Sequence, residues 1–420
     1  MNAPRILTFG CRLNSYESEV MRTHAAATEG PLVIVNTCAV TAEAERQARQ
    51  AIRRAHREQP EARIVVTGCA AQIDPASWSA LPGVTRVIGN TEKLLAESWS
   101  EGALGSGDAV SDIMQARETA AHLVTEFAGR ARAFVQIQQG CDHRCTFCII
   151  PFGRGPSRSV PIGAVVEQVR ALVGSGYREV VLTGVDITSY GSDLPGKPAL
   201  GQLARRLLAL VPELERLRLS SLDPVEIDED LWRLMEHEPR LMPHLHLSLQ
   251  AGSDLILKRM KRRHLASDAA RVIERARRLR PDIGIGADII AGFPTETDAL
   301  FDETLDFVRD HALPYLHVFP YSERPGTPAA RMPAMPVVVR RERARRLREA
   351  GQVASGRFHT SLIGQSISVL LESPTSGHSQ HFAPVRARAS EDAAPLGEAG
   401  QIVAAIVCGA DHAGLLAERV

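Results

Sequence analysis

The chain has 420 residues, of which 44% are hydrophobic and 23% are charged. This composition is ordinary for a globular protein, and the length predicts two or three domains. Lys plus Arg and Asp plus Glu both number 49, so the net charge is zero and only local charge clusters can argue for nucleic acid. The sequence has no apolar run of about eighteen residues and no apolar region at its start, so we expect neither a membrane span nor a signal peptide.

The first part of the chain alternates apolar runs with helical patterns. We predict strands at residues 5–9, 32–35 and 64–67, with helices at residues 15–28 and 41–57 between them. Ser15 and Thr41 are candidate helix caps. This order predicts a doubly wound parallel sheet. The Gly- and Ser-rich segment 102–108 is the best candidate for a linker.

A second alternating region begins near Phe127. Its predicted strands are residues 133–138, 179–183, 216–219, 244–249, 283–290 and 316–320. Helical patterns fall at residues 163–173, 200–211, 228–236, 267–280 and 297–310. Six β/α units in a row predict a barrel or partial barrel, a partial (β/α)6 barrel being the fold we expect.

The last part of the chain changes character twice. After Pro333 comes a basic helical pattern that contains Arg340, Arg341, Arg343, Arg345, Arg346 and Arg348. Apolar or alternating runs at residues 366–371, 383–389 and 402–407 then predict a small all-β barrel. We therefore expect α/β domains at residues 1–125 and 126–356, and a β-barrel at residues 357–420.

Cys141, Cys145 and Cys148 form a C-x3-C-x2-C run in one short loop. Thiolates are soft ligands, and three in one loop suit an iron–sulfur cluster or zinc. A four-iron cluster on three thiolates keeps one iron free of protein ligands, and that iron can bind a small molecule. A zinc knuckle with a distant fourth ligand is the alternative; the spacing disfavours it because zinc sites usually use C-x2-C pairs.

Cys11, Cys38 and Cys69 each follow a predicted strand of the first sheet. Ligands gather beyond the carboxyl ends of parallel strands, so these cysteines should converge on one edge and form a second cluster site. The alternative is three unrelated buried cysteines, which behave as small apolar residues. The seven cysteines of the chain suit metal binding or catalysis in the cytosol better than a disulfide scaffold. The seventh, Cys408, lies in an apolar run and is predicted to be buried.

Glycines and polar residues also cluster at the predicted strand ends of the second region. They lie in segments 182–185, 220–224, 246–253 and 286–296. Glycine lets a ligand approach the backbone closely, and catalytic residues of barrels come from strand ends on one face. We expect a ligand pocket on this face.

The chain resembles the radical S-adenosylmethionine enzymes in its C-x3-C-x2-C loop, in Phe147 before the third cysteine, and in the six β/α units that follow. The preceding cysteine domain and the final β-barrel, similar to a TRAM domain, resemble the methylthiotransferase subgroup. Segments 8–17, 182–185, 220–224 and 316–322 resemble the branch that modifies N6-threonylcarbamoyladenosine in tRNA. Thr295 departs from the glycine that the family often has there, which puts the local loop geometry in doubt.

The resemblance implies two [4Fe-4S] clusters, one on Cys141, Cys145 and Cys148 and one on Cys11, Cys38 and Cys69. The first would bind S-adenosylmethionine and release a 5′-deoxyadenosyl radical, which takes hydrogen from carbon 2 of the adenine. The second would hold the sulfur that is transferred as a methylthio group. By position, we expect the S-adenosylmethionine pocket to be lined by Phe147, Gly184, Ser221, Gln250 and Ile290.

The resemblance also implies partners. The substrate would be the anticodon loop of a tRNA, held by Arg340, Arg341, Arg345 and Arg348, by the basic face of residues 41–57, and by the final barrel with His378 and His381. Solvated arginines and ligand-free surface histidines are the plainer interpretation of these residues. An electron donor such as flavodoxin or ferredoxin and a sulfur source are also expected, with a cytoplasmic location.

Two other functions stay open at this point. One is the same chemistry on N6-isopentenyladenosine in tRNA, or on an aspartate of a ribosomal protein. The other is a non-catalytic iron–sulfur protein that binds RNA. Both cysteine triads are complete and the 286–296 strand end is intact, which favours an enzyme.

Overall fold

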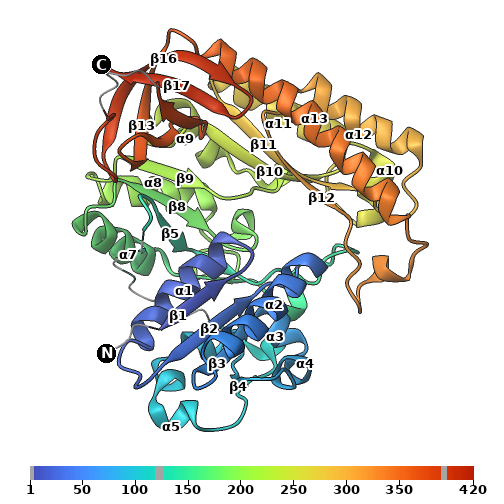
Figure 1. Cartoon of the computed structure of the whole chain (residues 1–420). Helices are drawn as coiled ribbons and strands as arrows, with labels where there is room; N and C mark the ends of the chain where they lie inside the picture. The colour runs from blue at the N-terminus through green and yellow to red at the C-terminus, as the bar shows by residue number, and fades with distance from the viewer. Residues whose placement is uncertain (1–3, 119–123, 125–126, 128, 389–394) are drawn as a thin grey trace.

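The computed structural model describes residues 4–118, 124, 127, 129–388 and 395–420, which form three packed parts (Figure 1). The N-terminal part lies at one side of the central part, and the C-terminal barrel lies against the other side. The expected domain boundary at residues 125 and 126, and the end of the predicted strand at residue 389, lie outside the described residues.

The N-terminal sheet is parallel, with its strands in chain order: β1 Arg5–Thr8, β2 Leu32–Thr37, β3 Arg63–Gly68 and β4 Val84–Val87. Its α-helices are α1 Arg12–His24, α2 Ala42–Glu58, α3 Cys69–Ile73, α4 Pro75–Ser79 and α5 Glu101–Leu104. Short 3-10 turns lie at Glu92–Leu94, Ala96–Trp99 and Ile113–Gln115. One face of the sheet packs on α2 to α4 and the other on α1 and α5, so both faces are covered, as predicted.

Local details of this domain correct two sequence predictions and confirm a third. Helix α1 begins at Arg12 with Cys11 at its N-cap position, so Ser15 lies inside the helix and does not cap it. Thr41 does cap α2, because its side chain accepts a hydrogen bond from the Ala44 amide. Segment 102–108 is not a linker: Leu104 is buried against the sheet, and the Asp108 side chain accepts a hydrogen bond from the Val87 amide.

The central part is an open arc of six strands. One sheet contains β5 Ala133–Gln136, β8 Glu179–Thr183 and β9 Arg216–Leu219, and the next contains β10 His244–Gln250, β11 Gly284–Ala291 and β12 Tyr315–Pro320. Backbone hydrogen bonds at Leu217 and Leu222 join the two sheets. The pairings within both sheets are parallel, so the predicted partial barrel is confirmed.

Helices cover the outside of this arc (Figure 1). They are α7 Ile162–Gly174, α8 Leu200–Leu210, α9 Glu229–His237, α10 Asp254–Met260, α11 Ala266–Leu279 and α12 Asp298–Asp310. Helix α6 (Ile150–Arg154) packs instead on α3 of the N-terminal part. The central part also contains 3-10 turns at Ile187–Ser189, Pro224–Glu226 and Pro328–Arg331 and a short ribbon of β6 Gln138–Gln139 with β7 Arg158–Ser159. Alternate strand residues such as Leu217, Leu245 and Ile285 pack beneath the helices. The residues between them, such as Arg218 and His246, are polar and face the inside of the arc. Tyr16 and Val20 of α1 join this core, which fixes the N-terminal domain on the arc.

Helix α13 (Val337–Ser361) crosses the arc and leads into a closed five-stranded barrel (Figure 1). Its strands are β13 Ser366–Ser373, β14 Ser376–Ser379, β15 Pro384–Ala387, β16 Ile402–Asp411 and β17 Gly414–Arg419. The sequence pattern predicts the barrel but misses β14, a polar segment of four residues, and β17, whose apolar stretch is brief and ends in Glu418 and Arg419. Cys408 is exposed rather than buried, because β16 alternates and Val407 takes the inward position. Among the described helices, none combines the length and apolar character that crossing a membrane requires.

Candidate active site

The first cysteine triad gathers where three strands of the N-terminal sheet end. Cys38 and Cys69 directly follow β2 and β3, and Cys11 lies just beyond β1. A Cβ on Gly10 would lie 2.6 Å from the Cys38 Sγ, and Gly10 has a φ of +92°, so glycine is needed there. Burial raises the pKa of Cys38 to about 12, and the nearby sulfurs of Cys69 and Cys11 contribute. The structure therefore brings together three thiols from distant parts of the chain.

The second triad occupies one loop beside the carboxyl ends of the arc strands. The Cys148 amide donates to the Cys145 carbonyl at 3.1 Å, which closes a turn. Thr146 fixes this loop on α10, donating from its amide to Met260 and from its hydroxyl to Arg259. Burial raises the pKa of Cys148 to about 12, with Cys145 and Cys69 acting in the same direction.

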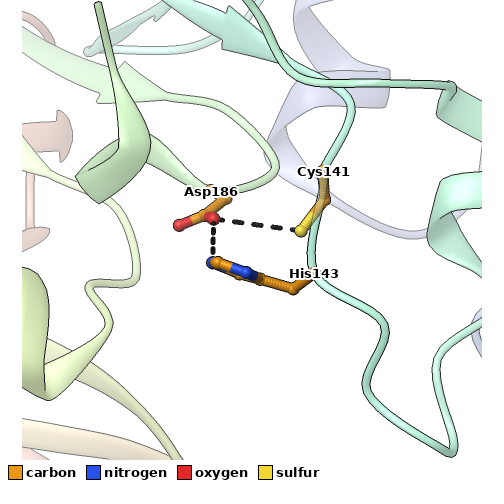
Figure 2. A group of neighbouring side chains, drawn as sticks. All are labelled: Cys141, His143 and Asp186. Carbon is orange, nitrogen blue, oxygen red and sulfur yellow. Dashed lines mark hydrogen bonds and ion pairs between the residues drawn. The ribbon is translucent and has the colours of Figure 1, made fainter. Parts of the chain in front are cut away.

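His143 anchors the C-x3-C part of that loop on the end of β8 (Figure 2). Its Nε2 lies 2.9 Å from Asp186 Oδ2, and the same carboxylate oxygen lies 3.8 Å from the Cys141 sulfur. Hydrogen bonds to Asp186 and then Glu226 raise the pKa of His143 to about 10, so the histidine is a cation at neutral pH. Ser189 and Thr188 also donate to Asp186, which holds its side chain in place.

The two triads adjoin each other across helix α6, which begins two residues after Cys148. A Cβ on Gly153 of this helix would lie 3.1 Å from the Cys69 Cβ. The next residue, Arg154, directs its Nε at the Cys69 sulfur from 3.1 Å. The loop that carries the second triad is thereby continuous with a helix that packs on the first triad.

Arg154 belongs to a buried polar network between the domains. Its guanidinium contacts Asn14 and both carboxylate oxygens of Glu17, with Nη2 2.9 Å from Oε2. Lys93 Nζ lies 2.6 Å from the same Oε2, and Gln139 Nε2 donates to Oε1 at 3.2 Å. Burial opposes the charged form of Glu17, but Arg154 and Lys93 outweigh it and lower its pKa. The sequence gives no signal for this network, since charged residues at these positions would ordinarily be exposed.

The distances between the sulfur atoms of each triad indicate which metal group the triad could bind. Among the described residues, neither triad forms a group with all three sulfurs within 4.8 Å of one another. Thiolates on one tetrahedral zinc lie about 3.8 Å apart, as follows from a Zn–S bond of about 2.3 Å. Both triads are therefore wider than a single zinc ion requires, whereas soft thiols set farther apart fit a [4Fe-4S] cluster.

Of the five residues predicted to line the S-adenosylmethionine pocket, four lie at the carboxyl ends of arc strands and Phe147 lies in the cysteine loop beside them. Phe147 and Ile290 belong to one apolar cluster that also contains Phe293. Gly184 follows β8, Ser221 follows β9, and Gln250 ends β10 with a φ of +72°. Their role as pocket residues stays a prediction.

The backbone at Thr295 shows what the departure from the family's glycine means for the loop. Its φ is +69°, in the left-handed region that glycine adopts readily and threonine does not. The Arg259 side chain donates to the Thr295 carbonyl at 3.0 Å and holds the turn in place. The loop therefore keeps a conformation suited to glycine, at some cost in strain.

The four arginines predicted to bind RNA differ in how far other protein groups already occupy their side chains. Arg340 donates to the carbonyls of Met335 and Tyr321 and pairs with Glu323, and its side chain is only 11% exposed. Arg345 pairs with Glu342 and Glu349, and Arg348 donates to the Val318 carbonyl. Arg341 is exposed and has no partner among the described residues. Arg341 is therefore the most available of the four, and their contact with RNA stays a prediction.

The two histidines of the final barrel have protein partners. His378 stacks on Phe382 and pairs with Glu372, and His381 is buried with its Nε2 2.9 Å from Asp282. On α2, Arg53 and Arg57 are exposed, whereas Arg49 lies over Trp78. These contacts leave Arg53 and Arg57 as the freest charges of the basic face.

Known proteins match nearly the whole chain. Residues 135–308 match the radical SAM superfamily, and residues 4–89 match the uncharacterized protein family UPF0004. The chain is 52% identical to the threonylcarbamoyladenosine tRNA methylthiotransferase MtaB of Rickettsia prowazekii, with 91% of this chain and 90% of that protein covered. It is 36% identical to the tRNA-2-methylthio-N(6)-dimethylallyladenosine synthase of Maricaulis maris, with 88% and 86% covered.

A solved structure supports the fold. The radical S-adenosylmethionine methyltransferase TsrM of Kitasatospora setae superposes with a TM-score of 0.55 at 15% identity, and covers 79% of this chain and 74% of its own. At that identity the likeness concerns the fold alone. The high identity to the Rickettsia protein, over nine tenths of both chains, decides the family. The chain belongs to the radical S-adenosylmethionine tRNA methylthiotransferases of the MtaB family.

Proposed function

We propose that this protein adds a methylthio group to carbon 2 of N6-threonylcarbamoyladenosine, next to the anticodon of tRNA. One structural observation carries the proposal: two cysteine triads, on different domains, meet across α6. A single cluster could abstract hydrogen but would leave no second site for the sulfur. The relative at 52% identity bears the name of this activity.

The cofactors are assigned to the triads as follows. The radical SAM family brings one [4Fe-4S] cluster and S-adenosylmethionine, held by Cys141, Cys145 and Cys148. The second [4Fe-4S] cluster, on Cys11, Cys38 and Cys69, is part of our proposal. When bound, these groups supply the hydrogen abstraction and the sulfur that protein side chains cannot.

The residues of the protein itself would hold and orient the reacting groups. Cys38 and Cys69 are buried, which keeps water from one side of the first triad. Arg154 and the network around Glu17 fix that triad against the second, so a base between them is held at a defined distance from both. The apolar cluster of Phe147, Ile290 and Phe293 would pack against S-adenosylmethionine.

The partners follow from the chemistry. The target base has to be unstacked from the anticodon loop to enter the site, and the final barrel with Arg341, Arg345 and Arg348 would hold the surrounding RNA. An electron donor such as flavodoxin or ferredoxin, a sulfur source and a cytoplasmic location are part of the same proposal.

Nucleoside analysis of tRNA tests this function. Cells that lack the protein should lose 2-methylthio-N6-threonylcarbamoyladenosine, and the gene should restore it. Genes with Cys69→Ala or Cys148→Ala should not restore it, whereas Cys408→Ala, which changes the exposed seventh cysteine, should. Loss from isopentenyladenosine instead would favour the activity named for the Maricaulis relative, and unchanged tRNA would contradict the proposal.

A further inference from the structure

An arginine without an ion pair follows the first cysteine of the N-terminal triad. Arg12 is half-buried and has no hydrogen bond or ion pair to any residue that the structure describes. A half-buried guanidinium without a counter-ion is costly unless an anion joins it.

The surroundings of Arg12 are rich in positive charge and lie inside the arc. The guanidinium carbons of Arg12, Arg132 and Arg218 lie 5.7, 5.2 and 5.1 Å from the centre of the Phe382 ring. Glu179 and Glu372 pair with Arg132, and Glu179 also pairs with Arg218. Arg12 is therefore the one cation of these three that forms no direct ion pair with a carboxylate of the described residues, and Asp288 and Glu179 act on its charge only from farther away.

Phe382 is half-buried and stands in a strained backbone conformation. It has a φ of +68°, which phenylalanine rarely adopts. Arg218 fixes its loop, donating to the carbonyls of Gln380 and Ser379 at 3.0 and 2.8 Å. An observed strain of this kind points to a function for the ring at the junction of all three domains.

A cavity and a set of polar side chains on the arc lie beside the three arginines and Phe382. A cavity of about 370 Å³ is lined by Arg130, Arg132, Phe134 and Glu372, next to the arginines around Phe382. On the arc, Asp288 Oδ1 lies 3.0 Å from His246 Nε2 and 3.3 Å from His317 Nδ1. The His317 side chain is 58% exposed, so its ring is open to a ligand.

The chemistry of the proposed substrate places an anion in the same region. Carbon 2 and carbon 6 of adenine both flank N1, so a substituent on N6 lies on the same edge of the ring as the carbon that reacts. Carbon 2 has to lie near both triads, and Arg12 directly follows Cys11 of the N-terminal triad in the chain. The threonylcarbamoyl group ends in a carboxylate, whereas an isopentenyl group is apolar.

We infer that Arg12 binds the carboxylate of the threonylcarbamoyl group, beside the Phe382 ring and with His317 as a second polar contact, and so selects this nucleoside over uncharged N6 substituents. The inference rests on the proposed function and names the specificity residue of that site. A guanidinium forms a charge-assisted pair with a carboxylate, and such a pair is stronger in a partly buried site than in water.

Binding to synthetic anticodon stem-loops tests the inference. Three RNAs are needed: one with threonylcarbamoyladenosine, one with its methyl ester, and one with plain adenosine at the same position. The reconstituted protein should prefer the free carboxylate to both others by about tenfold or more. Arg12→Met should abolish this preference and leave binding of the adenosine RNA within about twofold. Arg12→Lys should keep part of it, and His317→Gln should weaken it less than Arg12→Met.

Controls separate the possible outcomes. Arg205→Met changes an exposed arginine of α8 and should leave the preference intact. Iron content shows whether Arg12→Met disturbs the neighbouring Cys11, and the methyl ester on the wild-type protein needs no variant at all. Equal loss of affinity for all three RNAs would mean that Arg12 contacts a phosphate, and would overturn the inference.

An unchanged preference in Arg12→Met, or none in the wild-type protein, would overturn it too. The proposed function fails separately, if the wild-type protein does not methylthiolate the threonylcarbamoyladenosine RNA.

Discussion

At the scale of single residues, Arg154 is the strongest link between the two triads. It donates to the Cys69 sulfur and pairs with buried Glu17. We expect Arg154→Met to lower the reduction potential of the Cys11, Cys38 and Cys69 cluster, because a hydrogen bond and a positive charge leave the sulfur. A redox titration followed by electron paramagnetic resonance measures this shift. Arg57→Met, an exposed change, is the control, and an unaltered potential would show that Arg154 serves packing alone.

Single residues also show what the sequence can and cannot reveal. Cys11, Cys38 and Cys69 could be placed together because parallel strands end at one edge. Arg154 and Arg12 could not, since their roles depend on which domain packs against them. Thr295 stood out in the sequence as a departure from the family, but only its φ of +69° shows that the turn needs a left-handed residue.

At the scale of elements, Glu179 on β8 joins the arc to the final barrel. Burial pushes the pKa of Glu179 upward, but Arg218, Arg132 and Arg216 outweigh it and hold that pKa at about 2. Arg132 also reaches Glu372, and Arg216 and Arg218 contact the barrel at Ser368, Ser379 and Gln380. This one carboxylate therefore neutralises the arginines that dock the barrel.

Removal of the Glu179 charge should weaken the docking of the final barrel on the arc. Glu179→Gln leaves buried arginines without their counter-ion, so we expect a loss of about 3–5 kcal/mol in stability at neutral pH. Because the folded pKa is depressed, this stabilisation is complete above the unfolded value of about 4.3 and is lost as pH falls toward 2. The melting difference between wild type and variant should shrink over that range. Glu213→Gln, at an exposed site, is the control; a pH-independent difference would refute the charge argument.

Helices and strands were predicted best where the hydrophobic pattern of the sequence is strong. All six arc strands were found from apolar runs, because their outward residues pack beneath helices. Strands β14 and β17 were missed because barrel closure, rather than local pattern, pairs them. The start of α1 was placed three residues late, since Cys11 stands at the N-cap position without a side-chain cap.

At the scale of the whole molecule, three domains meet around one site. In the proposed site, the N-terminal domain contributes the first triad and Arg12, the arc contributes the second triad and the histidines, and the final barrel contributes Phe382. The domain order could be predicted from the sequence. The contact of the two triads across α6 could not, because it depends on how the domains pack.

The iron content of separate triad variants tests the central claim most directly. After anaerobic reconstitution, the wild-type chain should bind about eight irons, as expected for two [4Fe-4S] clusters. Replacement of Cys11, Cys38 and Cys69 by alanine should leave about four irons, and so should replacement of Cys141, Cys145 and Cys148. A wild-type chain with only about four irons, lost with one triad and untouched by removal of the other, would contradict the account.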